Sequence, residues 1–468
     1  MRGADREMVY LAEKLSDYVG RLSFEDIPPE SIKKAKYRIL DTIAVGMAGF
    51  RTDWARRVFE YARDWGGNPE STVMMFGEKT NAENAALVNG TMAHSLDYDD
   101  DLAGCHVGCV VVPAALAMAE RMGRSGKEVI ISVIAGYDVT VLISRMLNSR
   151  ILYQRGFHPT SVCGVFGSCV TAGRLLGLDV DKMVMGLGIA GSFVSGSMEY
   201  LADGSWTKRL QPGKAAKDGI AAVLLAERGY VGPKSVFEGN NGVLKAYTGE
   251  AFNERYLDGL GRDFEVNNAI TKRYPVCSCN TAPIEATLKI ISTHQLRPTD
   301  IKTIEVRTTE VCIGLVGEPI DEKRNPQTVL EAQLSLPYCV AVACIDRGFT
   351  FRQIEEDRLH DRQVLDLAQR IRVLPDPSFD ISVHPRPQPA IVTLETDTGD
   401  IFTERVDFPK GDSRNPLSES ELLEKLENCA GGLIDSARTR RIAETIFGLE
   451  KIQHISSLME MLRPHERL

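Results

Sequence analysis

Apolar residues recur at intervals of three and four positions from the N-terminus to about Tyr256, the spacing of helices with one buried face. Residues 28–30 (PPE) open the clearest such stretch, because proline is tolerated in the first turn of a helix. Its apolar positions are Ile32, Ala35, Ile39, Leu40 and Ile43. Residues 82–96 and 111–122 show the same spacing. Residues 164–196 mix glycine, alanine and serine with larger apolar residues, which favours close helix packing.

The spacing changes to a period of two after Arg262, as in strands with one buried face. Residues 301–307 and 390–396 alternate in this way, and residues 397–400 (DTGD) predict a hairpin turn before a strand at 401–408. Helical spacing occupies residues 282–293 and 334–345, and it returns from about Ser418 onward. No repeat of fixed length is visible, which argues against a helical solenoid.

These patterns predict a mainly α protein with an α+β part. Residues 1–265 are expected to form most of a large helical domain, and residues 411–468 to return to it as C-terminal helices. Residues 266–410 are expected to form a smaller, inserted α+β lid domain. The chain of 468 residues is long enough for each domain to bury its own core.

Charge and composition narrow the possible partners. Lysine and arginine number 55 against 64 acidic residues, and this net charge of −9 argues against a nucleic-acid surface but not against a local pocket for a small anion. The N-terminus lacks a signal core, and Asp138 and Arg145 interrupt the apolar stretch 129–147, so we expect a cytoplasmic protein without a membrane partner. The ten cysteines match no zinc or iron–sulfur spacing, and no metal is expected.

Acidic residues crowd the block at 94–101 (HSLDYDDD), and His106 follows closely. Carboxylates this close together repel one another, so burying the block is costly unless the charges are compensated. The block is either a solvated helix end or a site in which one carboxylate orients a catalytic histidine, and the residues alone leave both interpretations open.

A second block, residues 156–161 (GFHPTS), precedes a helix that we expect to begin near Val162. Thr160 or Ser161 suits its N-cap, and Pro159 prevents the helix from extending backward. His158 is then expected beside a helix N-terminus, which attracts carboxylates. A structural histidine and a catalytic one are both compatible with this position.

Cations cluster in residues 203–217, where Lys208, Arg209 and two further lysines lie among glycines and other small residues. Small residues allow an anion to approach the backbone and the cations closely. Lys272 and Arg273 add a basic pair at the start of the α+β region. These segments form either exposed basic turns or a ligand pocket between domains.

Five blocks taken together resemble the MmgE/PrpD family, which includes 2-methylcitrate dehydratases, cis-aconitate decarboxylases and an iminodisuccinate epimerase. They are residues 94–100 (HSLDYDD), 156–161 (GFHPTS), 203–210 (DGSWTKRL), 272–277 (KRYPVC) and 332–338 (AQLSLPY). Each is weak alone, but together they occur in the family's order. The resemblance extends from about Tyr10 to the C-terminal helices.

The resemblance implies a homodimer whose helical domain and α+β lid enclose an active site with neither a metal nor an organic cofactor. By the family's pattern, the catalytic residues are Asp97, His106, His158, Lys208 and Lys272.

The family pattern also suggests substrate-binding positions, most of which depart from it. Gln211 stands where many members have histidine, and Thr281 occupies a second such histidine position. Asp101 replaces a threonine that lies near the substrate in the decarboxylases, whereas Arg209 follows the pattern. We assign these four residues to substrate binding, and the departures weaken any assignment of one particular family substrate.

The chemistry implied by the family builds negative charge next to a carboxylate. Without a metal, this requires a positioned base and nearby cations. We therefore expect His106 and His158 to exchange protons with the substrate, because imidazole can act as either acid or base near neutral pH. Lys208 and Lys272 are expected to bind carboxylates, and Asp97 to orient a histidine.

The leading prediction is a lyase similar to 2-methylcitrate dehydratase, which eliminates water from a small hydroxy-di- or tricarboxylate. Decarboxylation of an unsaturated tricarboxylate such as cis-aconitate, and epimerisation beside a carboxylate, are the alternatives within the family. A carboxylate-binding protein without activity is the alternative of another class, and Gln211 and Thr281 give it some weight.

Overall fold

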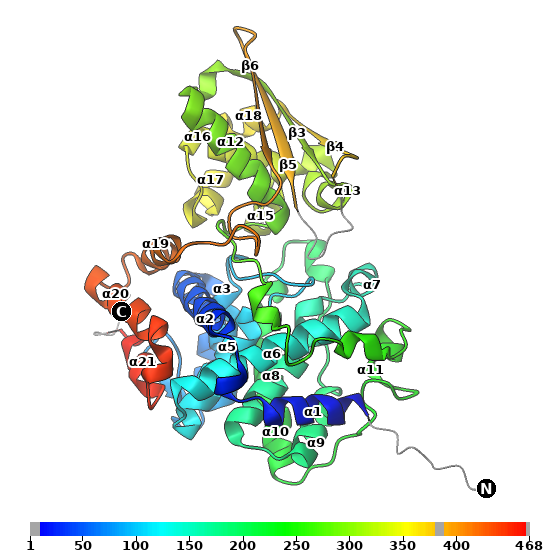
Figure 1. The fold of residues 1–468 in the computed structure, drawn as a ribbon. Helices are drawn as coiled ribbons and strands as arrows, with labels where there is room; N and C mark the ends of the chain where they lie inside the picture. Colours follow the sequence, from blue (N-terminus) through cyan, green and yellow to red (C-terminus); the bar gives the residue numbers. More distant parts are fainter. Residues whose placement is uncertain (1–9, 380–387, 465–468) are drawn as a thin grey trace, which may run out of the picture.

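Two hydrophobic cores organise the chain, which a computed structural model describes over residues 10–379 and 388–464. The first core contains buried side chains from Leu11 to Ala269 and again from Leu417 to Leu462, so the C-terminal segment packs back on the helical body (Figure 1). The second core extends from Tyr274 to Val406 and belongs to the part that carries the sheet. The predicted fold class, mainly helical with an α+β part, is confirmed.

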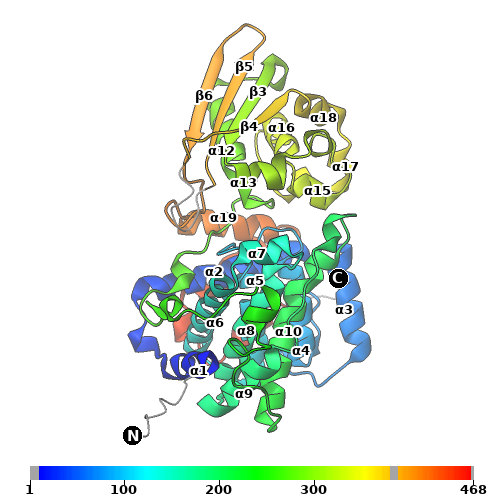
Figure 2. The same ribbon diagram turned by 90° about the vertical axis from the view of Figure 1, so that its right-hand side faces the viewer.

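Helices from both ends of the described chain form the helical body (Figures 1 and 2). They are α1 (Leu11–Arg21), α2 (Pro29–Gly49), α3 (Asp53–Trp65), α4 (Ala82–Ala93), α5 (Gly108–Met122), α6 (Gly126–Leu147), α7 (Ser149–Gln154), α8 (Pro159–Leu176), α9 (Val180–Ala190), α10 (Thr207–Glu227), α11 (Val243–Tyr247), α19 (Glu419–Ala430), α20 (Ser436–Phe447) and α21 (Ser456–Met461). A small hairpin of β1 (Ser71–Thr72) and β2 (Lys79–Thr80) precedes α4.

Helix α10 approaches α4 so closely that glycine is needed at the crossing. A Cβ atom on Gly90 of α4 would lie 2.7 Å from the Cα of Gly213 in α10, a separation that real Cβ atoms do not reach. The two backbones therefore pack in direct contact. This packing fixes the first turn of α10, which carries Lys208 and Arg209, relative to the acidic block that follows α4.

Helix α6 is the one helix of the described residues with the length and hydropathy of a membrane span, and 94% of its most apolar window is buried inside the protein. A helix that is apolar on all sides belongs either to a membrane or to a protein core. Its burial here is that of a core helix, around which α5 and α8 pack.

The lid, defined here as residues 274–406, is built on a mixed sheet with the strand order β4-β3-β5-β6. Its strands are β3 (Ile301–Thr308), β4 (Ile371–Pro375), β5 (Ala390–Thr396) and β6 (Ile401–Val406). Strand β3 pairs in parallel with β4 and antiparallel with β5, and β5 pairs with β6 across the predicted turn at 397–400. Strand β4 was not predicted, because Ile371 is its one buried residue and it therefore shows no alternation.

Helices pack against this sheet in Figure 2, with α12 against β5 and β6 and α16 against β4. The lid helices are α12 (Thr281–His294), α13 (Glu310–Cys312), α14 (Ile320–Lys323), α15 (Val329–Gln333), α16 (Leu336–Asp346), α17 (Glu356–Leu359) and α18 (Arg362–Ala368). Single helical turns lie at Phe24–Asp26, Glu199–Leu201, Glu254–Leu257, Glu265–Asn267, Ser278–Asn280, Pro298–Asp300, Ile313–Gly317, Phe351–Ile354 and Leu449–Lys451.

Candidate active site

Four of the predicted residues, Asp97, His106, Lys208 and Lys272, meet in one buried group, the Asp97 cluster. The Asp97 carboxylate lies 3.0 Å from Lys272 Nζ through Oδ1 and 3.2 Å from Lys208 Nζ through Oδ2. Nε2 of His106 lies 3.5 Å from Oδ1. The four residues come from the loop after α4, the segment before α5, the first turn of α10 and the connection to the lid. Residues distant in the sequence thus converge on one carboxylate.

The backbone of Asp97 adopts a left-handed conformation, with φ of +51°. Helix α4 ends at Ala93, and the chain turns sharply through His94, Ser95 and Leu96 before it reaches this residue. Aspartate tolerates this region better than most residues because its short side chain can bond locally. The turn points the Asp97 carboxylate toward the two lysines.

Burial and charge act in opposite directions on the ionisation of this group. Burial alone raises the pKa of Asp97, but the ammonium groups of Lys208 and Lys272 outweigh it and hold the pKa well below its ordinary value. At Lys272, burial opposes the charge, yet Asp97 overcomes it and raises the pKa of the ammonium group. At Lys208, burial prevails over the attraction of Asp97 and lowers the pKa.

His106 is held in a tautomer and a charge state that suit an acid. Its Nδ1–H donates to the carbonyl of Asp100 at 3.0 Å, and the Asp99 carboxylate lies 3.4 Å from the same nitrogen. Burial favours the neutral imidazole, but Asp99, assisted by Asp97, overcomes burial and raises the pKa of His106. The backbone N–H of His106 donates to Thr160 Oγ1 at 3.0 Å, which ties this segment to α8.

His94 and Asp99 also belong to the site, although no pattern in the sequence assigned either residue a role of its own. Nδ1–H of His94 donates to Asp99 at 3.0 Å, both side chains are fully buried, and the rings of His94 and His106 have centroids 4.6 Å apart. Burial lowers the pKa of His94 to about 4, against the pull of Asp99. His94 is therefore neutral at physiological pH and holds Asp99 in place. In the sequence, the signal available for this pair was the separation of His94 and Asp99 by five residues within the block 94–101.

His158 lies beside this group and is oriented by Gln211. Helix α8 begins at Pro159 and not near Val162, and His158 itself is the N-cap residue, because proline suits the first helical position. Nδ1 of His158 lies 2.8 Å from Gln211 Oε1. The amide of Gln211 is oriented by its Nε2, which donates to the carbonyl of Ser197 at 2.7 Å.

This contact decides the tautomer of His158. Since Gln211 offers an oxygen, Nδ1 of His158 carries the proton and Nε2 carries a lone pair. Burial, together with the nearby His94 and Lys208, holds the pKa of His158 well below its ordinary value. His158 is thus a neutral imidazole, with its ring centroid 6.4 Å from that of His106.

The remaining predicted residues, Arg209, Asp101 and Thr281, differ in the contacts that they make. Arg209 is buried and donates from Nη2 to Gln333 Oε1 at 2.5 Å, while its Nη1 has no hydrogen-bond partner in the described part of the chain. Asp101 accepts a hydrogen bond from Ser278 Oγ of the lid at 3.2 Å. Thr281 is buried at the start of α12.

A metal ion is a further chemical use for part of this group. Ligand atoms of His94, Asp97, Asp99 and His106 all lie within 4.8 Å of one another. A cation placed among them would share Asp97 with the ammonium groups of Lys208 and Lys272, which repel it. The arrangement therefore favours proton transfer and anion binding over metal binding.

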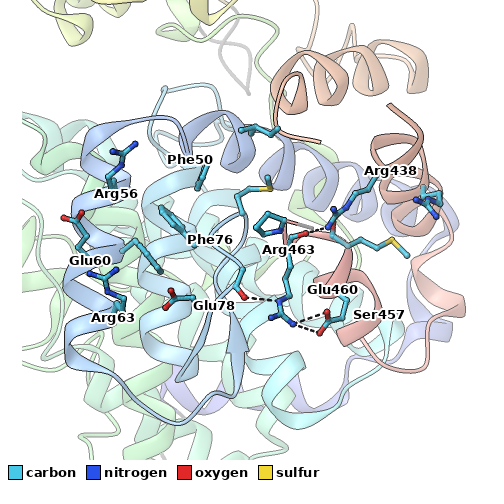
Figure 3. A pocket seen from close by; sticks show the side chains of 17 residues that line it. Phe50, Arg56, Glu60, Arg63, Phe76, Glu78, Arg438, Ser457, Glu460 and Arg463 are labelled. Carbon is cyan, nitrogen blue, oxygen red and sulfur yellow. Dashed lines mark hydrogen bonds and ion pairs between the residues drawn. The ribbon is translucent and has the colours of Figure 1, made fainter. Parts of the chain in front are cut away.

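A large surface cavity lies elsewhere, between α3, the loop at 75–78 and the C-terminal helices α20 and α21 (Figure 3). It has a volume of about 1230 Å³, and its lining includes Phe50, Phe76, Arg56, Arg63 and Arg463. None of the predicted site residues is among its lining residues. In this molecule the converging buried charges, and not the cavity volume, mark the candidate active site.

The MmgE/PrpD N-terminal domain matches residues 13–255, and the MmgE/PrpD C-terminal domain matches residues 274–450. The chain belongs to the MmgE/PrpD family. The two matched regions cover most of the helical body and the lid, so the family's architecture extends over nearly the whole chain.

Relatives within the MmgE/PrpD family carry two activities in their names. A cis-aconitate decarboxylase of Aspergillus terreus is 28% identical over 473 residues, covering 97% of this chain and 96% of the relative. A human cis-aconitate decarboxylase is 27% identical, covering 97% and 94%. A 2-methylcitrate dehydratase of Salmonella typhimurium is 22% identical over 443 residues, covering 88% and 86%. Decarboxylases and dehydratases of this kind are lyases, so the predicted enzyme class is confirmed.

Proposed function

We propose that this chain decarboxylates an unsaturated tricarboxylate such as cis-aconitate. The observation that carries the proposal is an acid, His106 favoured as the imidazolium, that meets the buried cations Lys208 and Lys272 at one carboxylate. The leading sequence prediction, dehydration, takes second place. The two decarboxylases named above are 28% and 27% identical to this chain, against 22% for the dehydratase, and their alignments cover more of the chain.

The reaction consumes one proton and no water. The electron pair of the bond to the departing carboxylate moves into a new carbon–carbon double bond and releases CO₂. The electron pair of the old double bond moves to the carbon that bears a second carboxylate, and this carbon then takes up the proton. Negative charge therefore develops on that carboxylate before the proton arrives, and cations that contact it lower the barrier.

The residues of the site fit these demands. Lys208 and Lys272 bind the carboxylates that the reaction retains, exchanging part of their contact with Asp97 for the substrate. Arg209 offers Nη1 as a further buried donor for a carboxylate oxygen. We assign His106 as the acid that delivers the proton, because its neighbouring carboxylates favour the protonated ring. The decarboxylation takes no proton from the substrate, so neutral His158 acts here as a positioned hydrogen-bond acceptor through Nε2 and becomes a base only in the dehydration considered below.

Dehydration of a hydroxy-tricarboxylate is the second candidate, because it needs both an acid and a base, for which His106 and His158 are suited, and because it has support from the dehydratase relative. The two reactions differ in their balance: dehydration releases water and leaves all carboxylates in place. Epimerisation would exchange one proton without loss of mass, and a binding protein would do neither.

Incubation with cis-aconitate, 2-methylcitrate and citrate in D₂O, followed by NMR, separates these functions. We expect cis-aconitate to lose CO₂ and its product to carry one deuteron from solvent. The His106→Gln variant is expected to lose this turnover, whereas exposed His454→Gln is expected to retain it. Water release from a hydroxy acid without CO₂, or binding without any exchange, would overturn the proposal. The homodimer and the cytoplasmic location stay predictions.

A further inference from the structure

Gln333 has been assigned no catalytic role above, but its side chain connects three segments of the site. It ends helix α15 of the lid, and its side chain is fully buried. Its Nε2 donates both hydrogens, one to the carbonyl of Leu96 and one to the carbonyl of Pro275 at 3.1 Å. Its Oε1 accepts from Arg209 Nη2. The amide thus contacts residues adjacent to or near Asp97, Lys208 and Lys272 without touching those side chains.

Lys425 makes the corresponding connection from the helical body. It lies on α19, is 4% exposed and forms an ion pair of 2.6 Å with Asp41 of α2. Its Nζ donates to the carbonyl of Lys272 at 2.7 Å and to the carbonyl of Tyr98 at 3.0 Å. The ammonium group also lies 3.8 Å from the centre of the Tyr98 ring.

The two side chains use the same pattern of contacts. Each donates one hydrogen bond to the loop that contains Asp97 and one to the segment that begins with Lys272. The loop carbonyls belong to Leu96 and Tyr98, the residues on either side of Asp97. Asp97, whose φ is +51°, is therefore held on both sides by donors from elements distant in the sequence.

We propose that Gln333 and Lys425 are positioning residues that fix the separation between the Asp97 carboxylate and the Lys272 ammonium group. Gln333 lies on a helix that contributes to the lid core and Lys425 on a helix of the helical core, so elements of both cores determine the geometry of one ion pair. The inference rests on the proposed function only insofar as Asp97 and Lys272 act in turnover. Small displacements of such groups slow the reaction strongly, since a shift of about 1 Å can reduce the rate about 100-fold.

Three variants test the role of Gln333 and Lys425. Gln333→Glu keeps the shape of the side chain and its contact with Arg209 but removes both donated hydrogen bonds. Gln333→Met removes the polar contacts, and Lys425→Met combined with Asp41→Leu removes the ion pair without leaving a buried carboxylate alone. We expect each to lower kcat by about 10- to 100-fold while the protein stays folded.

Matched controls come from similar residues away from the site. Gln353 of the lid also uses both ends of its amide, accepting from Thr350 and donating to Asp346, and Lys289 pairs with Glu404 at the surface. Gln353→Met and Lys289→Met are expected to keep kcat within about twofold of the parent.

A double-mutant cycle distinguishes positioning from general structural support. In an Asp97→Asn background, the geometry that Gln333 secures no longer matters, so Gln333→Glu should change kcat by less than about threefold. A structural role would instead give the full loss in both backgrounds. Equal losses in the two backgrounds would overturn the proposal.

Hydrogen exchange of the backbone provides a readout that does not require turnover. Peptides that cover residues 94–101 and 272–277 should exchange about tenfold faster in the Gln333 variants and in the Lys425 variant, but not in the controls. Failure of the wild-type protein to convert any tricarboxylate would reject the proposed function and leave this test intact. Unchanged exchange in both peptides, with kcat within twofold, would reject the positioning role.

Discussion

Two regions of the molecule carry several cations beside carboxylates, and they differ in how these charges are held. In the Asp97 cluster the ion-pairing side chains are at most 11% exposed, and both lysines come from segments more than one hundred residues away from Asp97. At the surface cavity of Figure 3, Arg463 pairs with Glu460 three residues away, and these side chains are 38% and 56% exposed. The Asp97 cluster therefore depends on the tertiary fold, whereas the pair of Arg463 and Glu460 needs only one turn of the chain.

This difference explains why the smaller, buried group is the better candidate for chemistry. Charges in the interior interact strongly because little water screens them, and each must be matched by a partner. The Asp97 cluster satisfies this with opposed charges that a substrate carboxylate can partly replace. Most of the charged side chains at the cavity, such as Arg56, Arg63 and Glu460, face water, which weakens their effect on a bound molecule.

The largest expected effect comes from removing the acid. His106→Gln should lower kcat on the substrate by about 10²–10⁴-fold, the usual contribution of a general acid, while circular dichroism shows the fold intact. Exposed His454→Gln is the matched control. A His106→Gln variant that turns over at the wild-type rate would remove His106 from the mechanism and weaken the distinction between the two regions.

Asp97→Asn tests the energetic side of the comparison. The substitution leaves Lys208 and Lys272 buried without their common counter-ion, and we expect the free energy of unfolding to fall by about 3–5 kcal/mol. Glu460→Gln at the cavity breaks an exposed pair and should cost about 1 kcal/mol or less. Urea denaturation of both variants measures the difference, and equal losses would contradict the view that only the Asp97 cluster depends on its charges.

Gln211→Leu tests the orientation of His158. The leucine side chain cannot accept from Nδ1–H, so the imidazole loses the partner that fixes its tautomer. A partner that orients a functional histidine is typically worth about 10- to 100-fold in activity, and we expect a loss of kcat in this range. Gln211→Glu retains an acceptor and should lose less. Identical kinetics for the two variants would show that the tautomer is not held by this contact.

The pH dependence gives a smaller but diagnostic effect. Because nearby carboxylates raise the pKa of His106 and the acid must be protonated, kcat/KM should stay high to a higher pH than an ordinary imidazole would allow. Above the raised pKa it should fall by about tenfold for each further pH unit. The contribution of the charged ring to stability has the same sign, present at low pH and lost as the pH rises through the raised pKa. A rate that increases through this range would identify His106 as a base.

The sequence singled out the four residues that meet in the Asp97 cluster, because charged residues within apolar helical segments are conspicuous and because their blocks resemble a family. The helical body and three of the four lid strands followed from periodicity alone. The role of Gln333 and Lys425 could not be predicted in this way. Gln333 lies in the block 332–338 that contributes to the resemblance, but the block does not indicate what its amide contacts, and Lys425 on an amphipathic helix resembles a surface residue. Their contacts span 237 and 327 residues to the Asp97 loop.

Local structure was predicted less well where one residue serves two purposes. His158 is both the N-cap of α8 and a candidate catalytic group, whereas the pattern favoured Thr160 or Ser161 as the cap. The acidic block was equally compatible with a solvated helix end, and only the fold brings the lysines and histidines that compensate its charge. Burial of a charge is decided by partners that a local pattern does not contain.

The smallest expected effect belongs to the surface cavity. Arg56→Ser and Arg63→Ser, made together, remove two exposed arginines of α3 from its lining. Because neither forms a buried pair, the free energy of unfolding should change by about 0.5 kcal/mol or less for each substitution, and kcat and KM should stay within about twofold. Steady-state kinetics and urea denaturation test this together. A marked loss of activity with unchanged stability would mean that the cavity communicates with the Asp97 cluster, and the division between a functional buried region and a solvated charged surface would no longer hold.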